Sequence, residues 1–273
     1  MKRRGAKTTP ATPASEIEAL GGDPKFMTSL ARGLAVIRTF SRERSKQSIT
    51  QISQATGISR AAVRRCLYTL SQLGYVESEE RQFSLRPKVL ALGHAYLSSA
   101  PLAASAQPFL DHVSSDLHES CSMAILDGEE IVYIARSATT RRIMSVDLRV
   151  GSRLPVYCTS MGRVLLANLP PADLTACVSR IELKPFTDRT ITSRERLGQV
   201  LDNVRRAGYA IVDQELEIGL RSIAVPVTDA AGNVVAAMNV SAQAARVTVR
   251  DMEARFLPRL QAAARELGLL LPA

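Results

Sequence analysis

The stretch from Thr50 to Leu73 reads TQISQATGISRAAVRRCLYTLSQL and has the pattern of two short helices separated by a tight turn. A hydroxyl at Ser48 or Thr50 can cap the first helix by accepting hydrogen bonds from its free N–H groups. Gly57 ends that helix, because glycine readily adopts the left-handed conformation that a sharp turn needs. Ile58 then offers an apolar plug. The pattern predicts a helix-turn-helix.

The second helix has two chemically different faces. Ser59 can cap it, so that it begins at Arg60. At 100° per residue one face collects apolar side chains, from Val63, Cys66, Leu67, Leu70 and Leu73. The opposite face collects Ala61, Arg64, Arg65, Tyr68 and Gln72. Guanidinium groups suit phosphate oxygens and the O6 and N7 atoms of guanine, so we expect this face to read double-stranded DNA.

An ordinary solvated helix face is the alternative interpretation of these arginines. The glycine turn, the two caps and the basic face occur together, and this combination favours DNA recognition over a solvated face. The candidate DNA contacts in this motif are Thr50, Ser59, Arg60, Ala61, Arg64, Arg65 and Tyr68.

The residues on either side complete a winged helix. Before the motif, an amphipathic helix is predicted, capped by Thr28 or Ser29, whose apolar positions are Met27, Leu30, Leu34, Ile37 and Phe40. After it, YVES and FSLR flank EERQ and predict a β-hairpin. The hairpin carries Glu79 and Glu80, which repel phosphates, so that only Arg81 and Arg86 qualify as DNA contacts there. We add Arg81 to the candidates.

Positive charge is concentrated in the first part of the chain. Residues 1–99 hold 16 Lys and Arg against 7 Asp and Glu, whereas residues 100–273 hold 19 of each. A basic N-terminal module joined to a neutral remainder is typical of a nucleic-acid reader attached to a domain that does not touch nucleic acid.

Composition shifts divide the chain into four parts. Residues 1–24 are rich in Thr, Pro and Ala, and we expect a mobile tail; the winged helix-turn-helix DNA-binding domain covers 25–87. Pro87 suits the first turn of a connecting helix over 88–100, whose wide apolar surface predicts packing against a second subunit, with packing on its own chain as the alternative. Residues 101–273 form the last part.

That last part predicts an α+β domain with one antiparallel sheet. Apolar runs flank Asp127-Gly128, a strong hairpin signal, and further strands are expected near 142–148, 209–213, 222–228 and 234–241. The predicted helices cover 104–118, 160–168, 172–180, 193–207 and 250–267, the last bent at Pro258.

Several classes of protein are excluded. The sequence has no apolar run of about 18 residues and so predicts no membrane span. The basic start is followed by GAKTTPATPASE, which lacks the apolar core of a secretory signal, and we expect a cytoplasmic protein. The four cysteines are scattered without a C-x-x-C pair; neither a disulfide framework nor a metal site is indicated, and no cofactor is expected.

Residues 26–273 resemble an IclR-type transcriptional regulator. The resemblance lies in TSLARGLAVIRTF, QATGISRAAVRRCLYTLSQLGYV, LPVYCTSMGRVLLANL, GYAIVDQELEIGLRSIAVPV and MNVSA, in this order. The segment RRIMS and the segment SLRPKVLALGHAYLSS resemble further the branch that controls protocatechuate, 4-hydroxybenzoate and β-ketoadipate catabolism. The resemblance implies a GAF-like effector domain, a homodimer or tetramer, a DNA operator and a small organic acid as signal; RNA polymerase is a further candidate partner.

The resemblance also implies where the effector binds. In the family the pocket is lined by the segment that matches TSMG and by strand ends that match GLRS and NVS, which gives Thr159, Ser160, Met161, Ser222, Asn239 and Ser241. Hydroxyl and free N–H groups at a helix N-terminus suit a carboxylate, and methionine gives an adaptable apolar contact. A simple helix cap is the equal alternative for Ser160.

The sequence departs from the family at one position. Many members have an acidic residue where this chain has Val212, and Asp213 follows it. Adjacent strand side chains point to opposite faces, so the place of Asp213 among the effector contacts depends on its orientation. Glu215 and Glu217 are either pocket or surface residues, and Arg221 is expected to be structural.

An enzyme is the competing class of function. The sequence has no G-x-S-x-G elbow, no G-x-G-x-x-G after a strand, no P-loop lysine and no H-E-x-x-H. The nearest constellation is Cys158 beside Thr159 and Ser160, and all three histidines lie upstream in other predicted elements. We therefore predict binding of the small molecule without turnover.

Overall fold

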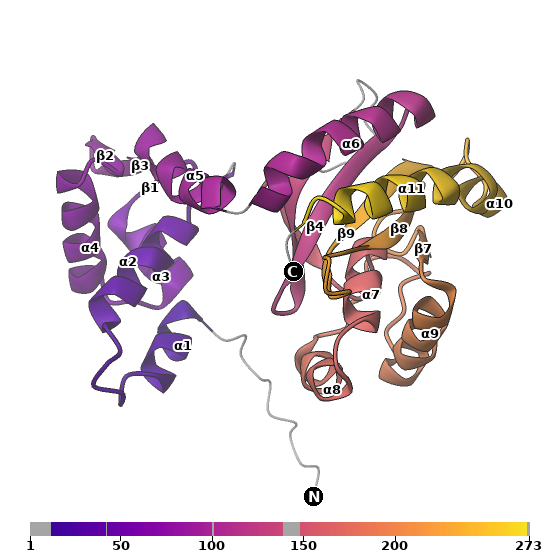
Figure 1. The fold of residues 1–273 in the computed structure, drawn as a ribbon. Coiled ribbons are helices and arrows are strands. Elements are labelled where there is room, and N and C mark those ends of the chain that lie inside the picture. The colour runs from indigo at the N-terminus through magenta and orange to yellow at the C-terminus, as the bar shows by residue number, and fades with distance from the viewer. Residues whose placement is uncertain (1–11, 42, 100, 139–147, 272–273) are drawn as a thin grey trace, which may run out of the picture. The chain divides into compact units, whose positions relative to one another are not determined.

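The computed structural model describes residues 12–41, 43–99, 101–138 and 148–271, and it divides the chain into two compact units (Figure 1). The first unit covers 1–95 and the second 96–273. Each has its own apolar core.

The first unit is a winged helix. Its helices are α1 (Pro13–Ala19), α2 (Thr28–Arg38), α3 (Ile49–Thr56) and α4 (Arg60–Gln72). Its small antiparallel sheet has the order β1-β3-β2, from β1 (Lys46–Gln47), β2 (Val76–Glu79) and β3 (Gln82–Leu85). The predicted hairpin is confirmed; the third strand, β1, has only two residues and no apolar alternation that would predict it.

The turn between α3 and α4 follows the local chemistry of the sequence. Ser48 caps α3 and forms a reciprocal capping box with Gln51, and Gly57 ends the helix at φ 74°. Ser59 caps α4, its hydroxyl accepting from the amide of Ala62 at 3.4 Å. The predicted helix-turn-helix is confirmed in each of these parts.

The N-terminal segment differs from the expected mobile tail. Residues 1–11 lie outside the described residues, but Pro13–Ala19 forms helix α1. Thr12 caps it, Pro13 occupies its first turn, and Ile17 is buried in the core of the winged helix. A seven-residue helix is marginal alone, so this one depends on the burial of Ile17, a single apolar anchor that composition does not reveal.

Helix α2 packs through only part of the predicted face: Ile37 and Phe40 pack against the core, and the other three predicted residues do not. It buries Ala35 and Val36, while Met27, Leu30 and Leu34 are 65%, 58% and 49% exposed. The predicted cap is also wrong: Met27 holds the cap position and makes no side-chain cap hydrogen bond.

The predicted connecting segment begins with a short 3-10 turn, Pro87–Val89, and continues as α5 (Leu90–Ser99). The boundary between the two compact units falls within α5, between Ala95 and Tyr96. Leu90, Leu92 and Tyr96 are exposed on it.

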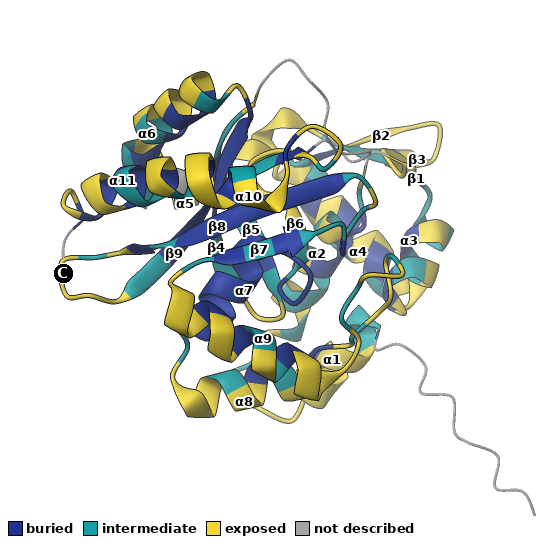
Figure 2. Cartoon of the chain, turned by 90° about the vertical axis from the view of Figure 1, so that its right-hand side faces the viewer, coloured by how far each residue is buried: buried dark blue, intermediate teal, exposed yellow. Residues whose placement is uncertain are grey.

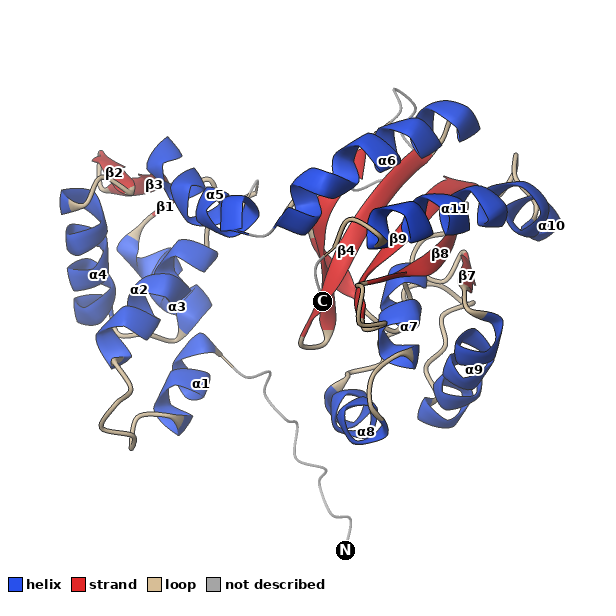
Figure 3. Ribbon diagram, viewed as in Figure 1, coloured by secondary structure: helices blue, strands red, loops and turns tan. Residues whose placement is uncertain are grey.

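The second unit is built on one six-stranded antiparallel sheet of order β6-β5-β4-β9-β8-β7 (Figure 3). In chain order the strands are β4 (Ser120–Asp127), β5 (Glu130–Ser137), β6 (Arg153–Pro155), β7 (Ala210–Asp213), β8 (Leu220–Thr228) and β9 (Val234–Gln243). The Asp127-Gly128 hairpin is confirmed. The strand predicted near 142–148 falls mainly on residues 139–147, outside the described residues, and Leu148 itself is not in a strand.

Helices cover both faces of this sheet. One face packs against α6 (Pro101–Leu117) and α11 (Leu257–Gly268), and the other against α7 (Ser160–Ala167), beyond which lie α8 (Pro171–Arg180) and α9 (Arg194–Ala207) (Figure 1). The strands between these layers are buried and the outer helix faces are exposed (Figure 2). The α+β class with a single antiparallel sheet is confirmed.

The predicted break in the final helix is a wide turn rather than a simple bend. Helix α10 (Val249–Asp251) runs into a π-helical turn, Met252–Phe256, and Pro258 stands in the first turn of α11. A proline cannot donate to the preceding turn and its ring displaces the carbonyl there, so the chain widens before it.

Candidate functional site

The outer face of α4 carries exposed polar side chains in the winged-helix unit. Arg60, Ala61 and Arg64 are exposed at its N-terminal half, and Tyr68 is 67% exposed although it is aromatic. The N-terminal residues of a recognition helix are those that enter the major groove in helix-turn-helix complexes. Thr50 is half-buried in the first turn of α3, and Ser59 is exposed at the N-cap of α4.

Arg65 lies apart from Arg64. It lines a hollow between α4 and α2 together with Leu30 and Leu34, so its stem is drawn toward α2. At the wing, Arg81 is exposed with φ 67°, and Glu79 forms an ion pair with Lys46 at 2.7 Å. Because Lys46 partly cancels the negative charge of Glu79, the wing repels phosphate less than its sequence suggests.

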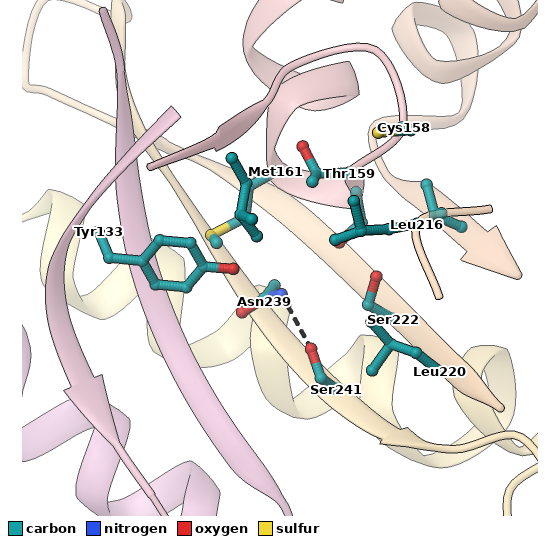
Figure 4. A pocket seen from close by; sticks show the side chains of 12 residues that line it. Tyr133, Cys158, Thr159, Met161, Leu216, Leu220, Ser222, Asn239 and Ser241 are labelled. Carbon is teal, nitrogen blue, oxygen red and sulfur yellow. Dashed lines mark hydrogen bonds between the residues drawn. The ribbon is translucent and has the colours of Figure 1, made fainter. Parts of the chain in front are cut away.

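In the second unit, one pocket lies between α7 and the sheet. The structure brings six of the seven predicted effector residues to its lining: Thr159, Ser160, Met161, Ser222, Asn239 and Ser241. Apolar side chains complete the wall, from Leu154, Val212, Leu216 and Leu220, with Cys158 and Tyr133 (Figure 4). None of the aliphatic residues could be assigned from sequence, because each looks like ordinary core.

The N-terminus of α7 decides between the two interpretations of Ser160. Thr159 is the cap: its hydroxyl accepts from the amide of Gly162 at 3.3 Å and donates to the carbonyl of Pro155 at 2.9 Å. Ser160 is therefore not the cap. Its Oγ is buried and has no hydrogen-bond partner among the described residues.

The sheet presents a second unsatisfied group to the same pocket. The Asn239 amide donates through Nδ2 to Ser241 at 3.2 Å, while its Oδ1 is buried without a hydrogen-bond partner among the described residues. Ser241 pairs with Ser222 in register, so both hydroxyls lie on the pocket face. A buried polar atom left unsatisfied costs about 1 to 3 kcal/mol, and two such atoms, Ser160 Oγ and Asn239 Oδ1, belong to residues that line this pocket.

Tyr133 and Arg136 add groups that sequence reasoning missed. The Tyr133 side chain points into the pocket on the side of Asn239 (Figure 4). Burial raises the pKa of its phenol to about 12, so the phenol is neutral and can donate. Arg136 donates to Ser122 at 2.9 Å, and Ser122 pairs in register with Asn239. Arg136 thus lies on the same face of the sheet as Asn239, with β4 between their two strands, but it is not one of the residues that line the pocket.

Asp213, the seventh predicted residue, does not line the pocket. Val212 does, and the alternation of the strand turns Asp213 to the other side, where its carboxylate pairs with Arg221 at 2.8 Å and Arg189 at 2.9 Å. Arg221 also donates to the carbonyls of Ala244 and Val247, which fits its expected structural role. We leave Asp213 out of the candidate effector site.

Glu215 is neither a surface residue nor a lining residue. Its carboxylate forms a bidentate pair with Arg163 of α7, with N–O distances of 2.7 and 2.6 Å, in a fully buried place behind the pocket. The pair fixes the loop after β7 to α7. Leu216, the next residue, is one wall of the pocket.

In this structure the pocket is nearly closed. Its side chains leave room for about one water molecule, so a ring-sized ligand requires the walls to move apart. Met161 and Leu216 face the cavity (Figure 4). Neither side chain is branched at Cβ, so both can change rotamer. A ligand of that size would have to displace side chains of α7 or of the loop after β7.

Two further properties bear on function. The described residues contain no group of three or more His, Cys, Asp and Glu side chains arranged to hold a metal ion. Among the helices of the described residues, none has both the length and the apolar character needed to cross a membrane.

Comparison with known proteins identifies both units. Residues 29–80 match the IclR helix-turn-helix domain, and residues 94–269 match the bacterial transcriptional regulator IclR C-terminal domain. The chain is 58% identical over 257 residues to the Pca regulon regulatory protein of Pseudomonas putida, which covers 94% of this chain and 88% of that protein. It is 37% identical to the p-hydroxybenzoate hydroxylase transcriptional activator of Acinetobacter baylyi, over 90% of this chain and 92% of the other.

A solved structure is similar over most of the chain. An IclR homologue from Microbacterium hydrocarbonoxydans, crystallised in complex with 4-hydroxybenzoate, superposes with a TM-score of 0.74 at 25% identity, over 88% of this chain and 97% of that one. The family matches cover both the winged helix and the α+β unit that contains the pocket. This chain therefore belongs to the IclR family of bacterial transcriptional regulators.

Proposed function

We propose that this chain is a ligand-responsive regulator of aromatic-acid catabolism, which binds an operator through α4 and a small aromatic or keto acid between α7 and the sheet. The observation that carries the effector site is the pair of buried oxygens, Ser160 Oγ and Asn239 Oδ1, which have no hydrogen-bond partner among the described residues and belong to the lining of one cavity. The 58% identity to a Pca regulon regulator, and the 4-hydroxybenzoate bound to a homologue, support the aromatic class.

The chemistry of the pocket suits an organic acid with a flat apolar body. The Ser160 hydroxyl and the amides of Ser160 and Met161, in the first turn of α7, can donate to a carboxylate. The Arg136 guanidinium adds positive charge on the sheet face that carries Asn239. Asn239 Oδ1 can accept from a ring hydroxyl or from a protonated group at the other end of the ligand. Met161, Leu154 and Leu216 cover the ring.

Calorimetry with protocatechuate, 4-hydroxybenzoate and β-ketoadipate tests this assignment. We expect one of the three to bind with a 1:1 stoichiometry per chain. If none of the three binds to purified protein that still recognises its operator, the assignment to aromatic-acid catabolism is wrong and the effector is another small organic acid.

The Ser160→Ala variant is expected to bind the effector about 5- to 100-fold more weakly, because it removes a donor that only the ligand satisfies. Its melting temperature without ligand should be unchanged or higher, since an unpartnered buried hydroxyl is removed. Calorimetry and a thermal melt measure the two effects. Ser179→Ala, on the exposed helix α8, is the matched control and should leave affinity unchanged. A fall in unliganded stability at Ser160 together with unchanged affinity would assign it a structural role.

For DNA recognition, Arg64→Ala is expected to cost roughly 1 to 3 kcal/mol of operator binding if the guanidinium reads a base. Arg64 is exposed on the outer face of α4, away from the hollow that Arg65 lines. Anisotropy with operator and with scrambled duplex separates base reading from phosphate contact. Arg250→Ala, exposed in the second unit, is the control. Equal losses on both duplexes would assign Arg64 to phosphate.

We further propose that the chain acts as a homodimer or tetramer. Exposed apolar side chains on α2 and α5, among them Leu30, Leu34, Leu90 and Leu92, favour burial against a second copy. Light scattering on the purified protein measures the mass directly, and a monomer at micromolar concentration would contradict this proposal.

We propose that the protein binds the small acid without converting it. Burial raises the pKa of the Cys158 thiol to about 12, so this residue stays protonated at neutral pH and is a poor nucleophile. No histidine stands among the residues that line the pocket, and Ser160 therefore has no imidazole base there. Recovery of the intact acid after prolonged incubation with the protein tests this point.

A further inference from the structure

Helix α7 reaches the effector cavity with one end and a second hollow with the other. Ser160 and Met161, in its first turn, line the effector cavity. Leu165 in its last turn, with Asn168 and Leu169 directly after it, lines a hollow of about 390 Å³. Eight helical residues span about 12 Å. The two spaces therefore lie at opposite ends of one short helix, which is buried over its whole length.

The hollow lies in a gap of the six-stranded sheet. The pairing of β4 with β9 stops at Ala124 and Ala237. Strand β4 continues to Asp127 and β9 begins at Val234, so the end of β4 and the start of β9 do not pair with each other. These two strand ends line the hollow through Ile125, Leu126, Val234 and Val235.

The gap brings together the layers on the two faces of the sheet. Leu165 and Leu169 pack in the core on the α7 face. Leu102, in the first turn of α6, packs in the core on the opposite face and lines the same hollow. Tyr96 of α5 also lines the hollow and is 48% exposed. Through the gap, α7 thus faces residues of α5 and α6, although the sheet lies between α7 and α6 (Figure 1).

Tyr96 belongs to the helix that joins the two compact units. Helix α5 runs from Leu90 to Ser99, and the boundary between the units falls between Ala95 and Tyr96. Tyr96 is therefore the first residue of the second unit. Hydrogen bonds between successive turns hold a helix together, so a displacement of Tyr96 is a displacement of α5.

Free space is distributed unequally between the two ends of α7. The effector cavity has room for about one water molecule, whereas the hollow has about 390 Å³. The first turn of α7 is tightly packed, because a Cβ atom added to Gly162 would stand 2.5 Å from the Cα of Val156. A close-packed interior does not compress, so a ligand that displaces this turn must move atoms toward space that already exists. The hollow at the C-terminal end of α7 provides that space.

We propose that α7 transmits effector binding through the gap between β4 and β9 to Tyr96 on the connecting helix. An effector that enters its cavity displaces α7, the C-terminal end of α7 moves into the hollow, and Leu169 presses on Tyr96. Operator affinity then changes because α5 leads into the DNA-binding unit. This inference rests on the proposed effector site and names the residues that carry its signal.

The first test removes the receiving side chain with Tyr96→Ala. Operator affinity is measured by anisotropy without acid and with a saturating concentration of protocatechuate, 4-hydroxybenzoate or β-ketoadipate, whichever binds the unchanged chain. The two affinities should differ by about 5- to 150-fold for the unchanged chain and by less than about 3-fold for the variant. Because this ratio compares a variant with itself, a general loss of operator affinity cancels. Calorimetry without DNA should show that the variant binds the acid no more weakly, since Tyr96 does not line the effector cavity.

The matched control is Tyr209→Ala, which removes the same side chain elsewhere in the second unit. Tyr209 donates to Glu253 at 2.9 Å and lines neither the effector cavity nor the hollow. This variant should keep the full ratio of operator affinities.

The second test fills the hollow with Val235→Phe. Val235 lines the hollow and not the effector cavity. The added ring occupies the space into which α7 moves, so the acid should bind at least about fivefold more weakly. The melting temperature without acid should not fall, because the hollow accommodates the ring. Val249→Phe adds the same ring at an exposed position of α10 and should leave the affinity for the acid unchanged.

Four results would overturn the proposal. These are an operator affinity of the unchanged chain that does not respond to bound acid, a full ratio in Tyr96→Ala, an equal loss of the ratio in Tyr209→Ala, and an unchanged affinity for the acid in a stable Val235→Phe. If Val235→Phe lowers the melting temperature, Tyr96→Ala alone decides. If none of the three acids binds the unchanged chain, the proposed effector assignment fails instead, so the two failures are distinguishable.

Discussion

The Glu215→Gln variant is expected to lose about 3 to 5 kcal/mol of unfolding free energy, because it leaves the Arg163 guanidinium buried without a counter-charge. The two side chains are 3% and 10% exposed and form two charge-assisted hydrogen bonds of 2.7 and 2.6 Å. An unpaired charge in that place cannot be hydrated, so the penalty is far larger than the loss of a surface ion pair.

The same pair joins three segments of the second unit. Arg163 also donates through Nε to the carbonyl of Tyr157 at 2.9 Å, and Glu215 accepts from the amide of Ile191 at 3.1 Å. Replacing both charges by Arg163→Met with Glu215→Leu should recover a large part of the stability, because two apolar groups of similar volume need no solvation. Recovery remains incomplete, since the carbonyl of Tyr157 and the amide of Ile191 lose their partners.

Urea unfolding followed by circular dichroism measures this effect, because the chain has no tryptophan for fluorescence. The control is Glu182→Gln, which breaks an ion pair with Lys184 whose side chains are 77% and 62% exposed. That variant should lose less than about 1 kcal/mol. A loss at Glu215 no greater than at Glu182 would show that the buried pair contributes nothing beyond surface electrostatics.

The DNA-binding unit could be predicted from sequence because its signals are local. The caps at Ser48 and Ser59 and the turn at Gly57 act within a few residues, and the wheel of α4 separates buried from exposed positions. The same reasoning failed on α2, where apolar residues surround most of the helix. Packing against the neighbouring helices determines which face of α2 is buried, and a helical wheel contains no information about that packing.

The pocket could be predicted only in part, because it depends on the register of the sheet. The resemblance to the family supplied Ser160, Asn239 and their neighbours, but Tyr133 joins them through the pairing of β5 with β4 and of β4 with β9. A bulge at Met123 and Ala124 shifts that pairing by one residue. One residue of shift exchanges the two faces of a strand, so composition alone cannot assign them.

Long-range polar pairs were beyond prediction for a related reason. Arg163 and Glu215 are 52 residues apart, and nothing in the local sequence of either distinguishes a buried partner from a solvated charge. Asp213 shows the converse: it was a candidate because it follows the position where many family members have an acidic residue, and its orientation, which follows from strand alternation, removes it. Strand alternation could have predicted the orientation of Asp213 once the face of Val212 was known.

The Gly162→Ala variant is expected to destabilise the second unit by about 2 to 5 kcal/mol, the range for a substitution that forces backbone out of a packed core. A Cβ atom at this position would overlap the backbone of Val156, 2.5 Å from its Cα and closer still to its carbonyl oxygen, and would stand 2.6 Å from Thr159 Oγ1. The first turn of α7 can therefore pack against Val156 only without a side chain. Alanine favours a helix by about 1 kcal/mol over glycine, which is too little to offset this overlap.

The control is Gly198→Ala in α9, where an added Cβ would meet no atom within 4 Å. Helix propensity acts there without a clash, so this variant should gain about 0.4 to 1 kcal/mol. The two substitutions are chemically identical and opposite in expected sign, and the same urea experiment measures both. Stabilisation of Gly162→Ala would show that α7 can shift away from Val156 at little cost. In that case the N-terminus of α7 would not be a fixed reference for a ligand, and the coupling of pocket occupation to movement of α7 would need little energy.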